Sequence, residues 1–541
     1  MKSYWLTNGR IIDGTGSTAK EGNILIEDEK IIRIQEETPD DGLPQIDCED
    51  HIVAPGFIDI HSHLDWFAGN EGSRELMMPF LQQGITTAVG GNCGFSTFGF
   101  PVSHPYRELL SDNIFRSGRA KLSWQNAAGY KEHIKENGSP MNILSYVGHG
   151  TTRTSIRGYD ANPLTDAELK QLLSLLDESL KQGACGISLG LQYEPGIFAD
   201  KKELKAVAEL VKSHNKVLAV HPRAASAVSG TYPMKPFGTP HHILAIQDMI
   251  ELAEETGVRL QFSHLIFVGS QSWKSADKAF KLLEDAKVRG VDIHFDTYGY
   301  SLGASRINVI LPEWFLADLN KNVESKSALK RLWVEIKAME LVLGFGFEQI
   351  RVTNTVYPEW KKYNGLYLSE IARNLGQSSF KTLCDLVRLS NGTAAVLMER
   401  YSNPEILKRM IAHPQVHYQT DAWMEREGIN NPAIYGSIPR ILKLSREHNI
   451  QSIEESIRKM TGATAERLGI PKRGYIRKGY YADLVVLNEK TISDREDENG
   501  IPLPPEGIKR VIINGKMLLT PETAKEINPV GSEMPGMFIH I

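Results

Sequence analysis

Through the middle of the 541-residue chain, eight short apolar runs alternate with stretches that have the apolar spacing of helices. The runs end in "GFIDIHSH", "GITTAVGGNC", "NILSYVGHG", "ACGISLGLQY", "KVLAVHPR", "RLQFSHL", "VDIHFDTYGY" and "VHYQTDAW". Among the intervening stretches, residues 165–183 begin with a capping box of Thr165 and Glu168, which predicts a helix. Eight strand–helix units in about 400 residues predict a TIM (β/α)8 barrel. A doubly wound parallel sheet is the alternative, and it fits this count less well.

Both ends of the chain have a different pattern, in which short β-rich runs alternate with turns. This pattern predicts a small β-sandwich domain built from both chain termini, residues 1–55 and 468–520. The barrel then spans residues 56–467. Within it, the segment from about 315 to 413 is too long for one connection, so we expect an insertion with extra helices and a lid over the barrel mouth. Residues 521–541 are turn-rich, and we expect a C-terminal tail on the surface of this subunit or of a partner.

Composition argues against several classes of function. The chain has 41% hydrophobic and 23% charged residues and a net charge of -5, as expected of an ordinary globular protein. It has neither a basic patch for nucleic acid nor an apolar run of the ~18 residues that a membrane-spanning helix needs. The start, "MKSYWLTNGR", does not read as a secretory signal. The four cysteines are far apart, which favours a reducing, cytoplasmic location. A homo-oligomer is left open.

Metal-type side chains follow the predicted strands at the ends where a barrel carries its chemistry. Imidazole, thiolate and carboxylate are together the ligand set of zinc or a similar ion. Taken singly, a histidine at a strand end is more often a satisfied polar group, as we expect for His149 and His294. A single cysteine is more often a small buried filler, and a single aspartate can be a helix N-cap. The shared position favours a metal site formed by His61, His63, Cys93, His221 and His264, with Asp421 beside it.

A further set of motifs identifies a family resemblance. "APGFIDIHSHLDW", "GGNCGFS", "VGHGTTR", "GISLGLQYEPG", "VHPR", "FSH", "MTGATAERLGI", "RGYIRKGYYADLVVLN" and "VIINGK" together resemble the amidohydrolase superfamily, in particular its D-aminoacylase (N-acyl-D-amino-acid deacylase) branch. The resemblance runs from about residue 5 to 518. It implies a zinc-dependent hydrolase acting on carbon–nitrogen bonds other than peptide bonds.

The resemblance also implies roles for single residues. Many relatives use a modified lysine or a glutamate as the anion shared by two metals, whereas in the D-aminoacylase branch a cysteine takes that place, and Cys93 matches it. Cys93, His221 and His264 would hold one Zn²⁺ tightly. His61 and His63, with Cys93 shared, would form a second site, and Asp421 would act as general base and acid.

The substrate residues of that branch are altered here. A lysine that helps to bind the substrate carboxylate is replaced by Ile266, and a histidine after the catalytic aspartate is replaced by Asn431. Another cation could take over the carboxylate, or the substrate differs from the usual N-acyl-D-amino acid. The candidate substrate-binding residues are Tyr193, Arg223, Tyr298, Ser305 and Arg306, with a structural role as the alternative for each arginine.

These features predict a metal-dependent amidohydrolase that cleaves the C–N amide bond of a small molecule in the manner of a D-aminoacylase. The alternative is a cyclic amide hydrolase that opens a hydantoin-, dihydropyrimidine- or imidazolone-type ring. A non-catalytic scaffold barrel ranks below both, because such a protein would be expected to lose ligands, and here all the ligand-type residues are present.

Overall fold

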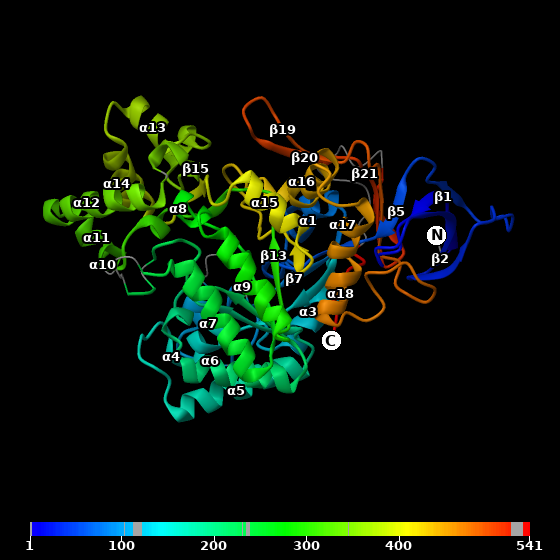
Figure 1. Cartoon of the computed structure of the whole chain (residues 1–541), viewed down its shortest axis with the longest axis horizontal. Helices are drawn as coiled ribbons and strands as arrows, with labels where there is room; N and C mark the ends of the chain where they lie inside the picture. Colours follow the sequence, from blue (N-terminus) through cyan, green and yellow to red (C-terminus); the bar gives the residue numbers. More distant parts are fainter. Residues whose placement is uncertain are drawn as a thin grey trace.

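The computed structural model describes most of the chain, and Figure 1 shows it from the blue N-terminal strands to the red C-terminal segment. The described residues are 3–101, 103–111, 122–229, 231–233, 238–316, 318–344, 346–520 and 534–541. Within these ranges the fold is mixed α/β. None of the described helices has the length and apolar character to cross a membrane.

Parallel strands form the central part of the molecule. They are β6 Phe57–Asp59, β7 Ile85–Gly90, β8 Asn142–Ser145, β9 Val147–Gly148, β10 Gly186–Gly190, β11 Val217–His221, β12 Arg259–Phe262, β13 Ile293–Thr297 and β17 Val416–Tyr418. Their order follows the sequence, β6-β7-β8 in one sheet and β9 to β13 and then β17 in the other. Only one residue separates β8 from β9, so these two strands occupy one position in the series. The nine labelled strands therefore occupy eight positions. A doubly wound sheet would reverse its strand order at a switch point, and this order does not reverse.

The two ends of this strand series approach each other. After β17, the backbone N–H of Asp421 donates to the carbonyl of His61, which follows β6, over 2.9 Å. The Thr420 N–H and hydroxyl both donate to the buried carboxylate of Asp59, over 3.0 and 2.6 Å. The first and last strands of the series therefore meet at their carboxyl ends.

Helices cover the outside of the strands (Figure 1). They are α1 Ser73–Gln82, α2 Arg107–Ser111, α3 Ala127–Asn137, α4 His149–Arg157, α5 Asp166–Lys181, α6 Lys201–Ser213, α7 His241–Thr256, α8 Ser270–Trp273, α9 Ala276–Val288, α15 Pro404–Ala412, α16 Ala433–Glu447, α17 Ile453–Met460 and α18 Gly462–Leu468. Helix α5 begins with the predicted capping box of Thr165 and Glu168. Its Leu172 and Leu176 are fully buried and face inward.

Both ends of the chain contribute to one eight-stranded sheet. Its strands are β1 Ser3–Ile11, β2 Lys20–Glu27, β3 Lys30–Gln35, β4 Gln45–Asp47, β5 Ile52–Pro55, β18 Leu484–Leu487, β21 Ile508–Ile513 and β22 Lys516–Leu519. The antiparallel pairing of β5 with β18 joins the N-terminal strands to the C-terminal ones. A separate pair, β19 Ser493–Glu496 and β20 Pro502–Glu506, lies against α16.

Between β13 and β17 the chain builds a separate unit with its own apolar core. An antiparallel sheet in the order β14-β16-β15 forms its centre, from Gly303–Arg306, Ala395–Met398 and Ile350–Asn354. Its helices are α10 Glu313–Leu316, α11 Leu319–Asn322, α12 Lys326–Leu343, α13 Leu368–Leu375 and α14 Ser379–Ser390. Strand β14 precedes the expected insertion at 315, so the added unit draws on residues closer to β13 than the sequence indicated.

Of the expected C-terminal tail, residues 521–533 lie outside the described residues, and residues 534–541 pack against their own chain. Phe538 and Ile539 are each 5% exposed. Ile539 joins a core cluster with Ile58 of β6 and Ile60 just after it, and its N–H donates to the carbonyl of Ile143 over 2.8 Å. The aromatic and branched residues in "GMFIHI" give the tail enough apolar surface to be buried.

Candidate metal centre

The predicted metal-type residues come together at the carboxyl ends of the parallel strands. His221 is the last residue of β11, while the others lie within four residues after β6, β7, β12 and β17. One ligand atom each from His61, Cys93, His264 and Asp421 lies within 4.8 Å of all the others. The predicted convergence of these residues on one point is therefore present in the fold.

The thiol of Cys93 lies at the centre of this group. Its Sγ atom is 3.4 Å from Nε2 of His61, 3.6 Å from Nδ1 of His221 and 3.6 Å from Nε2 of His264. The thiol is 2% exposed, so it does not face bulk solvent. Its neighbours are three ring nitrogens, which an apolar filler would not require.

These spacings can be compared with those of a zinc site. With Zn–S near 2.3 Å and Zn–N near 2.0 Å, tetrahedral geometry separates sulfur from nitrogen by about 3.5 Å. All three sulfur–nitrogen distances of Cys93 agree with that value. The 2.8 Å between Nδ1 of His221 and Nε2 of His264 is shorter than the roughly 3.3 Å of the same geometry. The donor types and sulfur spacings fit zinc, and the histidine pair would have to separate by about half an ångström.

The glycines around Cys93 allow its loop to pack closely on strand β10. A Cβ atom added at Gly190 would lie 2.0 Å from the carbonyl oxygen of Cys93, and one at Gly94 would lie 2.7 Å from the Gly190 nitrogen. The hydroxyl of Ser188 accepts from the Gly94 N–H over 3.0 Å and donates to the carbonyl of Gly91. The residues of "GGNCG" therefore hold the thiol against the fourth strand position.

Burial disfavours the charged form of three histidines, His61, His63 and His221. Burial lowers the pKa of His63, and it lowers the pKa values of His61 and His221 well below their ordinary range. Neutral imidazole is the form that binds a metal. Burial raises the pKa of the Cys93 thiol, and the nearby carboxylates of Asp421 and Asp296 raise it further. A bound cation would reverse this effect, because it stabilises the thiolate.

Asp421 is the most accessible member of the group. Its Oδ1 lies 3.4 Å from Nε2 of His61 and 3.4 Å from Nε2 of His63. Its side chain is 28% exposed, whereas both histidine side chains have no exposed surface. Burial acts to raise the pKa of Asp421, but His264, His61 and His63 outweigh it and hold this pKa below its usual range. The carboxylate is therefore ionised and partly exposed to solvent.

Two supporting residues were not singled out from the sequence. The amide oxygen of Gln192 accepts from Nε2 of His221 over 3.2 Å, which leaves the Nδ1 lone pair directed at Cys93 and His264. The carboxylate of Asp296 accepts from the backbone N–H of His264 over 2.6 Å. Gln192 stands in the quoted "GLQYEPG", and Asp296 is a polar residue in a buried strand, so both signals were available in the sequence.

Three tyrosines surround the same region. Tyr193 lies over His221, with ring centroids 4.4 Å apart. The hydroxyl of Tyr298 donates to the carbonyl of Leu302 over 2.6 Å. Burial and the carboxylate of Asp421 raise the pKa values of both Tyr298 and Tyr401. Tyr401 follows β16 in the inserted unit, and no sequence motif indicated it.

The remaining candidates line a small cavity or are already paired. Arg306 and Ser305 line a small cavity with Trp423, whose ring centroid is 5.7 Å from that of His63. Nη2 of Arg306 pairs with Oε1 of Glu425 at 2.7 Å. Nη1 and Nη2 of Arg223 donate to the carbonyls of Ile197 and Ala199 over 2.8 and 2.7 Å.

His149 and His294 have partners away from the thiol, although Nδ1 of His149 is buried without a hydrogen-bond partner in the described part of the chain. Nε2 of His149 pairs with the buried carboxylate of Glu203 at 2.7 Å. Nδ1 of His294 lies 3.1 Å from Nε2 of His417. Neither histidine belongs to the group around Cys93.

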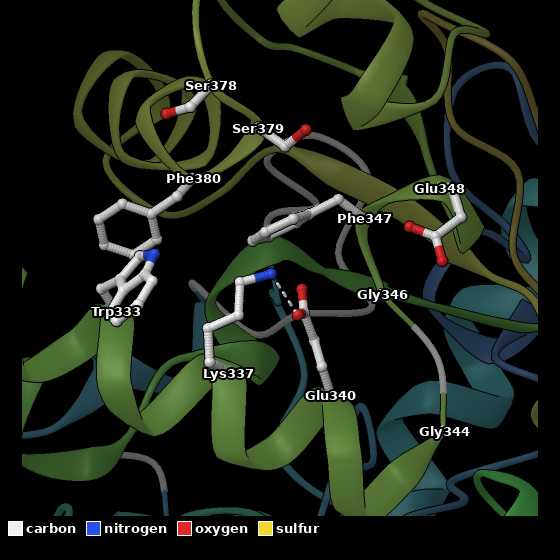
Figure 2. Close-up of a pocket in the computed structure, with 10 residues that line it drawn as sticks. All are labelled: Trp333, Lys337, Glu340, Gly344, Gly346, Phe347, Glu348, Ser378, Ser379 and Phe380. Carbon is white, nitrogen blue, oxygen red and sulfur yellow. Dashed lines mark hydrogen bonds and ion pairs between the residues drawn. The ribbon is translucent and has the colours of Figure 1, made fainter.

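A larger cleft of about 500 Å³ lies in the inserted unit, between α12 with the adjoining Gly344, residues 346–348 and the start of α14 (Figure 2). Trp333, Phe347 and Phe380 line it, together with the ion pair of Lys337 and Glu340. Its lining includes none of the metal-type residues, so cavity size does not locate the candidate centre.

Comparison with known proteins decides the family. The Amidohydrolase family matches residues 45–296 and 399–518, which together make up most of the chain. The chain belongs to the amidohydrolase family. The match leaves out residues 297–398, the region of the inserted unit.

Among individual relatives, this amidohydrolase is 25% identical to a D-aminoacylase from Alcaligenes xylosoxydans xylosoxydans, over 94% of this chain and 93% of that protein. It is 26% identical to an N-acyl-D-glutamate deacylase from the same organism, over 94% and 92%. The predicted resemblance to D-aminoacylases is therefore confirmed.

Solved structures agree in fold. An N-acyl-D-glutamate deacylase from Bordetella bronchiseptica, complexed with zinc and a phosphonate inhibitor, is 24% identical with a TM-score of 0.77 and 99% of both chains covered. A D-aminoacylase structure gives a TM-score of 0.78 at 23% identity, again with 99% of both chains covered. This amidohydrolase therefore has the D-aminoacylase fold.

Proposed function

We propose that the chain is a metal-dependent amidohydrolase that cleaves a C–N amide bond of a small molecule, as a D-aminoacylase does. One observation carries this proposal: a thiol, imidazoles and an ionised carboxylate lie within 4.8 Å of one another at the strand ends of an amidohydrolase fold. Sequence motifs alone would be weaker support, because an inactive relative could keep the motifs of the family. Such a relative would be under no constraint to keep the donor atoms at ligand spacing.

Cys93, His221 and His264 would hold one Zn²⁺, and His61 and His63 would form a second site that shares Cys93. The 3.4–3.6 Å sulfur–nitrogen spacings support this assignment, as does the burial of His221, which lowers its pKa and favours the metal-binding neutral form. When bound, the ion supplies Lewis-acid polarisation of the scissile carbonyl and a hydrolytic nucleophile at neutral pH.

Asp421 would act as the general base and then as the general acid. Its ionised form accepts a proton from the attacking water, whose oxygen forms the new bond to the carbonyl carbon. The same proton then goes to the leaving nitrogen as the C–N bond breaks. The exposure of this side chain, 28%, supports the role, because the carboxylate can reach both water and substrate.

The pocket residues would position the substrate. Tyr193 lies against His221, where its hydroxyl could donate to the carbonyl oxygen as negative charge develops. Tyr298, Ser305 and Arg306 lie on the side of the inserted unit, and that unit would cover the mouth. The substrate is an N-acyl compound or, as the second candidate, a cyclic amide. Ile266 in place of the lysine favours the latter, because a ring amide has no free carboxylate to be paired.

We also propose the domain organisation that the sequence indicated. The eight strand positions of residues 56–467 would close as a (β/α)8 barrel, supported by the hydrogen bonds between the segments after β6 and β17. The terminal sheet would fold over itself as a β-sandwich. Its support is an apolar cluster with members from β1, β2, β5, β18 and β21, which a flat sheet would leave uncovered.

Metal analysis and one broad assay test this function. We expect purified protein to contain zinc in at least 1:1 ratio and to release acetate from N-acetyl amines or to open cyclic ureides. Removal of zinc by a chelator should abolish turnover, and zinc addition should restore it. Full activity of the metal-free protein would contradict the proposal, as would a zinc-loaded protein that hydrolyses no amide.

A further inference from the structure

We propose that a buried cluster of three side chains, His149, Arg153 and Glu203, positions Cys93 for metal binding although none of the three belongs to the group around the thiol. The cluster fixes the first turn of α4, and that turn holds the backbone that follows Cys93. The inference rests on the metal site of the proposed function and adds positioning residues to it. The juxtaposition that carries it is the first turn of α4, which contacts both the cluster and the Cys93 loop.

The cluster joins α4 to α6 in the protein interior. Oε1 of Glu203, on α6, lies 2.7 Å from Nε2 of His149 and 3.2 Å from Nε of Arg153, both on α4. The side chains of His149 and Arg153 have no exposed surface, and that of Glu203 is 2% exposed. Residues four apart lie on the same face of a helix, so one carboxylate holds the start of α4 at two successive turns.

A gain in stability alone does not explain such a cluster. The cost of removing charged groups from water largely offsets their attraction, and apolar side chains of similar volume often stabilise a fold as well or better. This cluster also leaves Oε2 of Glu203 and Nδ1 of His149 buried without a hydrogen-bond partner in the described ranges. What its hydrogen bonds supply, and apolar contacts lack, is a defined geometry between the two helices.

The first turn of α4 in turn holds the loop that carries Cys93. The N–H of Thr151 donates to the carbonyl of Gly94 over 3.0 Å. The Thr151 hydroxyl accepts from the N–H of Ser96 over 2.9 Å and donates to the carbonyl of Ser96 over 3.2 Å. Just before α4, the N–H of Gly148 donates to the Ser96 hydroxyl over 2.8 Å. A Cβ atom added at Gly148 would lie 2.5 Å from the Gly94 carbonyl oxygen, so the two backbones are in close contact.

Cys93 requires such support because its backbone is strained. Its φ of 56° lies in the left-handed region, which a residue other than glycine keeps only where its surroundings fix it. The next residue, Gly94, is held at both of its backbone polar groups, since its N–H donates to the Ser188 hydroxyl and its carbonyl accepts from Thr151. Loosening the contact with α4 would let Cys93 relax to a negative φ, which would turn Sγ away from the three ring nitrogens that lie 3.4–3.6 Å from it.

A first pair of variants tests the cluster through zinc affinity. His149→Leu removes the contact with Glu203 and keeps the ion pair of Arg153 with Glu203, whereas His149→Gln keeps an N–H donor for that carboxylate. In chelator competition we expect His149→Leu to weaken zinc binding roughly tenfold or more, and His149→Gln to change it by less than about threefold. Protein loaded with Co²⁺ reports a bound thiolate through its sulfur-to-metal charge-transfer absorption, and His149→Leu should weaken that absorption.

A second pair tests the contact between α4 and the loop. Thr151→Val removes the hydroxyl that bonds to Ser96. Thr154→Val is the matched control, because Thr154 is in the same helix, is also 1% exposed, and donates its hydroxyl to the carbonyl of Gly150 within that helix. We expect Thr151→Val to weaken zinc binding roughly tenfold and Thr154→Val to weaken it by less than about threefold.

The outcomes separate the inference from the proposed function. A folded His149→Leu protein with the zinc affinity and charge-transfer absorption of the wild type would overturn the inference, because the cluster would then be structural only, and the proposed hydrolase function would stand. If His149→Leu does not fold, the threonine pair decides, and equal zinc affinity of Thr151→Val and Thr154→Val would overturn the inference. Wild-type protein that binds neither zinc nor cobalt would overturn the proposed function and this inference together.

Discussion

The general-base role of Asp421 is best tested by Asp421→Asn, which keeps the size of the side chain and one oxygen. General acid–base catalysis contributes roughly 100- to 10,000-fold in rate, or about 2.7–5.5 kcal/mol of barrier at 1.36 kcal/mol per decade. We expect kcat to fall by that range. Zinc content should stay near that of the wild type, because Cys93, His221 and His264 are unchanged and lie 2.8–3.6 Å from one another.

The assay is steady-state acetate release with zinc measured by elemental analysis on the same samples. Asp160→Asn is the matched control, since this aspartate is on the surface next to Arg157 and should not affect turnover. A kcat for Asp421→Asn within tenfold of wild type, at equal zinc content, would refute the assignment. Loss of zinc in that variant would instead make Asp421 a ligand.

The pH profile adds an independent check. Neighbouring histidines hold the pKa of Asp421 below its usual range despite burial. A base works in its deprotonated form, so Asp421 stays active through neutral and mildly acidic pH, and its loss by protonation would begin only in strong acid. Any decline of kcat/KM between about pH 5 and 7 should therefore persist in the residual activity of Asp421→Asn. Disappearance of that decline in the variant would contradict a lowered pKa.

Four further predictions concern the thiol, the amide of Gln192 that contacts His221, and the tail. Cys93→Ala should lose stoichiometric zinc. Wild-type protein should release about one proton per zinc, because burial raises the pKa of the Cys93 thiol and zinc binding must ionise that thiol. Calorimetry of zinc binding in buffers with different heats of ionisation measures the number of protons released. If no proton is released, Cys93 does not bind zinc as a thiolate. Gln192→Leu should weaken zinc binding roughly 10- to 100-fold in chelator competition. Gln192→Glu keeps a hydrogen-bond acceptor and should bind zinc as tightly as the wild type. Equal zinc affinity of the two variants would show that Gln192 does not support the metal centre. Phe538→Ala should lower the free energy of unfolding in urea by about 3–5 kcal/mol. Val288→Ala, at an 88% exposed side chain, should change it by less than about 0.5 kcal/mol, and equal effects would mean that the tail is not packed.

The strand series and the ligand-type residues could be predicted because both depend on local pattern. Buried parallel strands are continuous apolar runs, and the residue types that follow them are visible in one sequence. Each of His61, Cys93, His221, His264 and Asp421 follows or ends such a run. Since parallel strands in sequential order end at one rim, position along the sequence was enough to predict their convergence.

Other parts could not be predicted because they depend on distant partners. Tyr401 lies near Asp421 because the strands of the inserted unit pair in the order β14-β16-β15, which cannot be inferred from the local sequence. The pairing of Arg306 with Glu425 joins residues 119 positions apart. Burial of Phe538 likewise depends on the surfaces of Phe98 and Tyr130, with which its ring makes edge contacts. The roles of such residues depend on partners that are distant in the sequence, whether or not the sequence indicates the residue itself.

The orientation of the ligand-type side chains also depends on a backbone feature that the sequence does not indicate. Cys93, His264 and Asp421 have φ values of 56°, 32° and 46°, in the left-handed region that residues other than glycine rarely adopt. A left-handed residue just past a strand end interrupts the alternation of faces, so its side chain can turn across the rim. Each such residue costs on the order of 1–3 kcal/mol and persists only where its surroundings fix it. Here the N–H of His264 is held by Asp296 and that of Asp421 by the carbonyl of His61. Glycine would relieve this strain but would supply no donor atom, so three costly conformations at one rim are best explained by the ligand atoms that they direct to a common point.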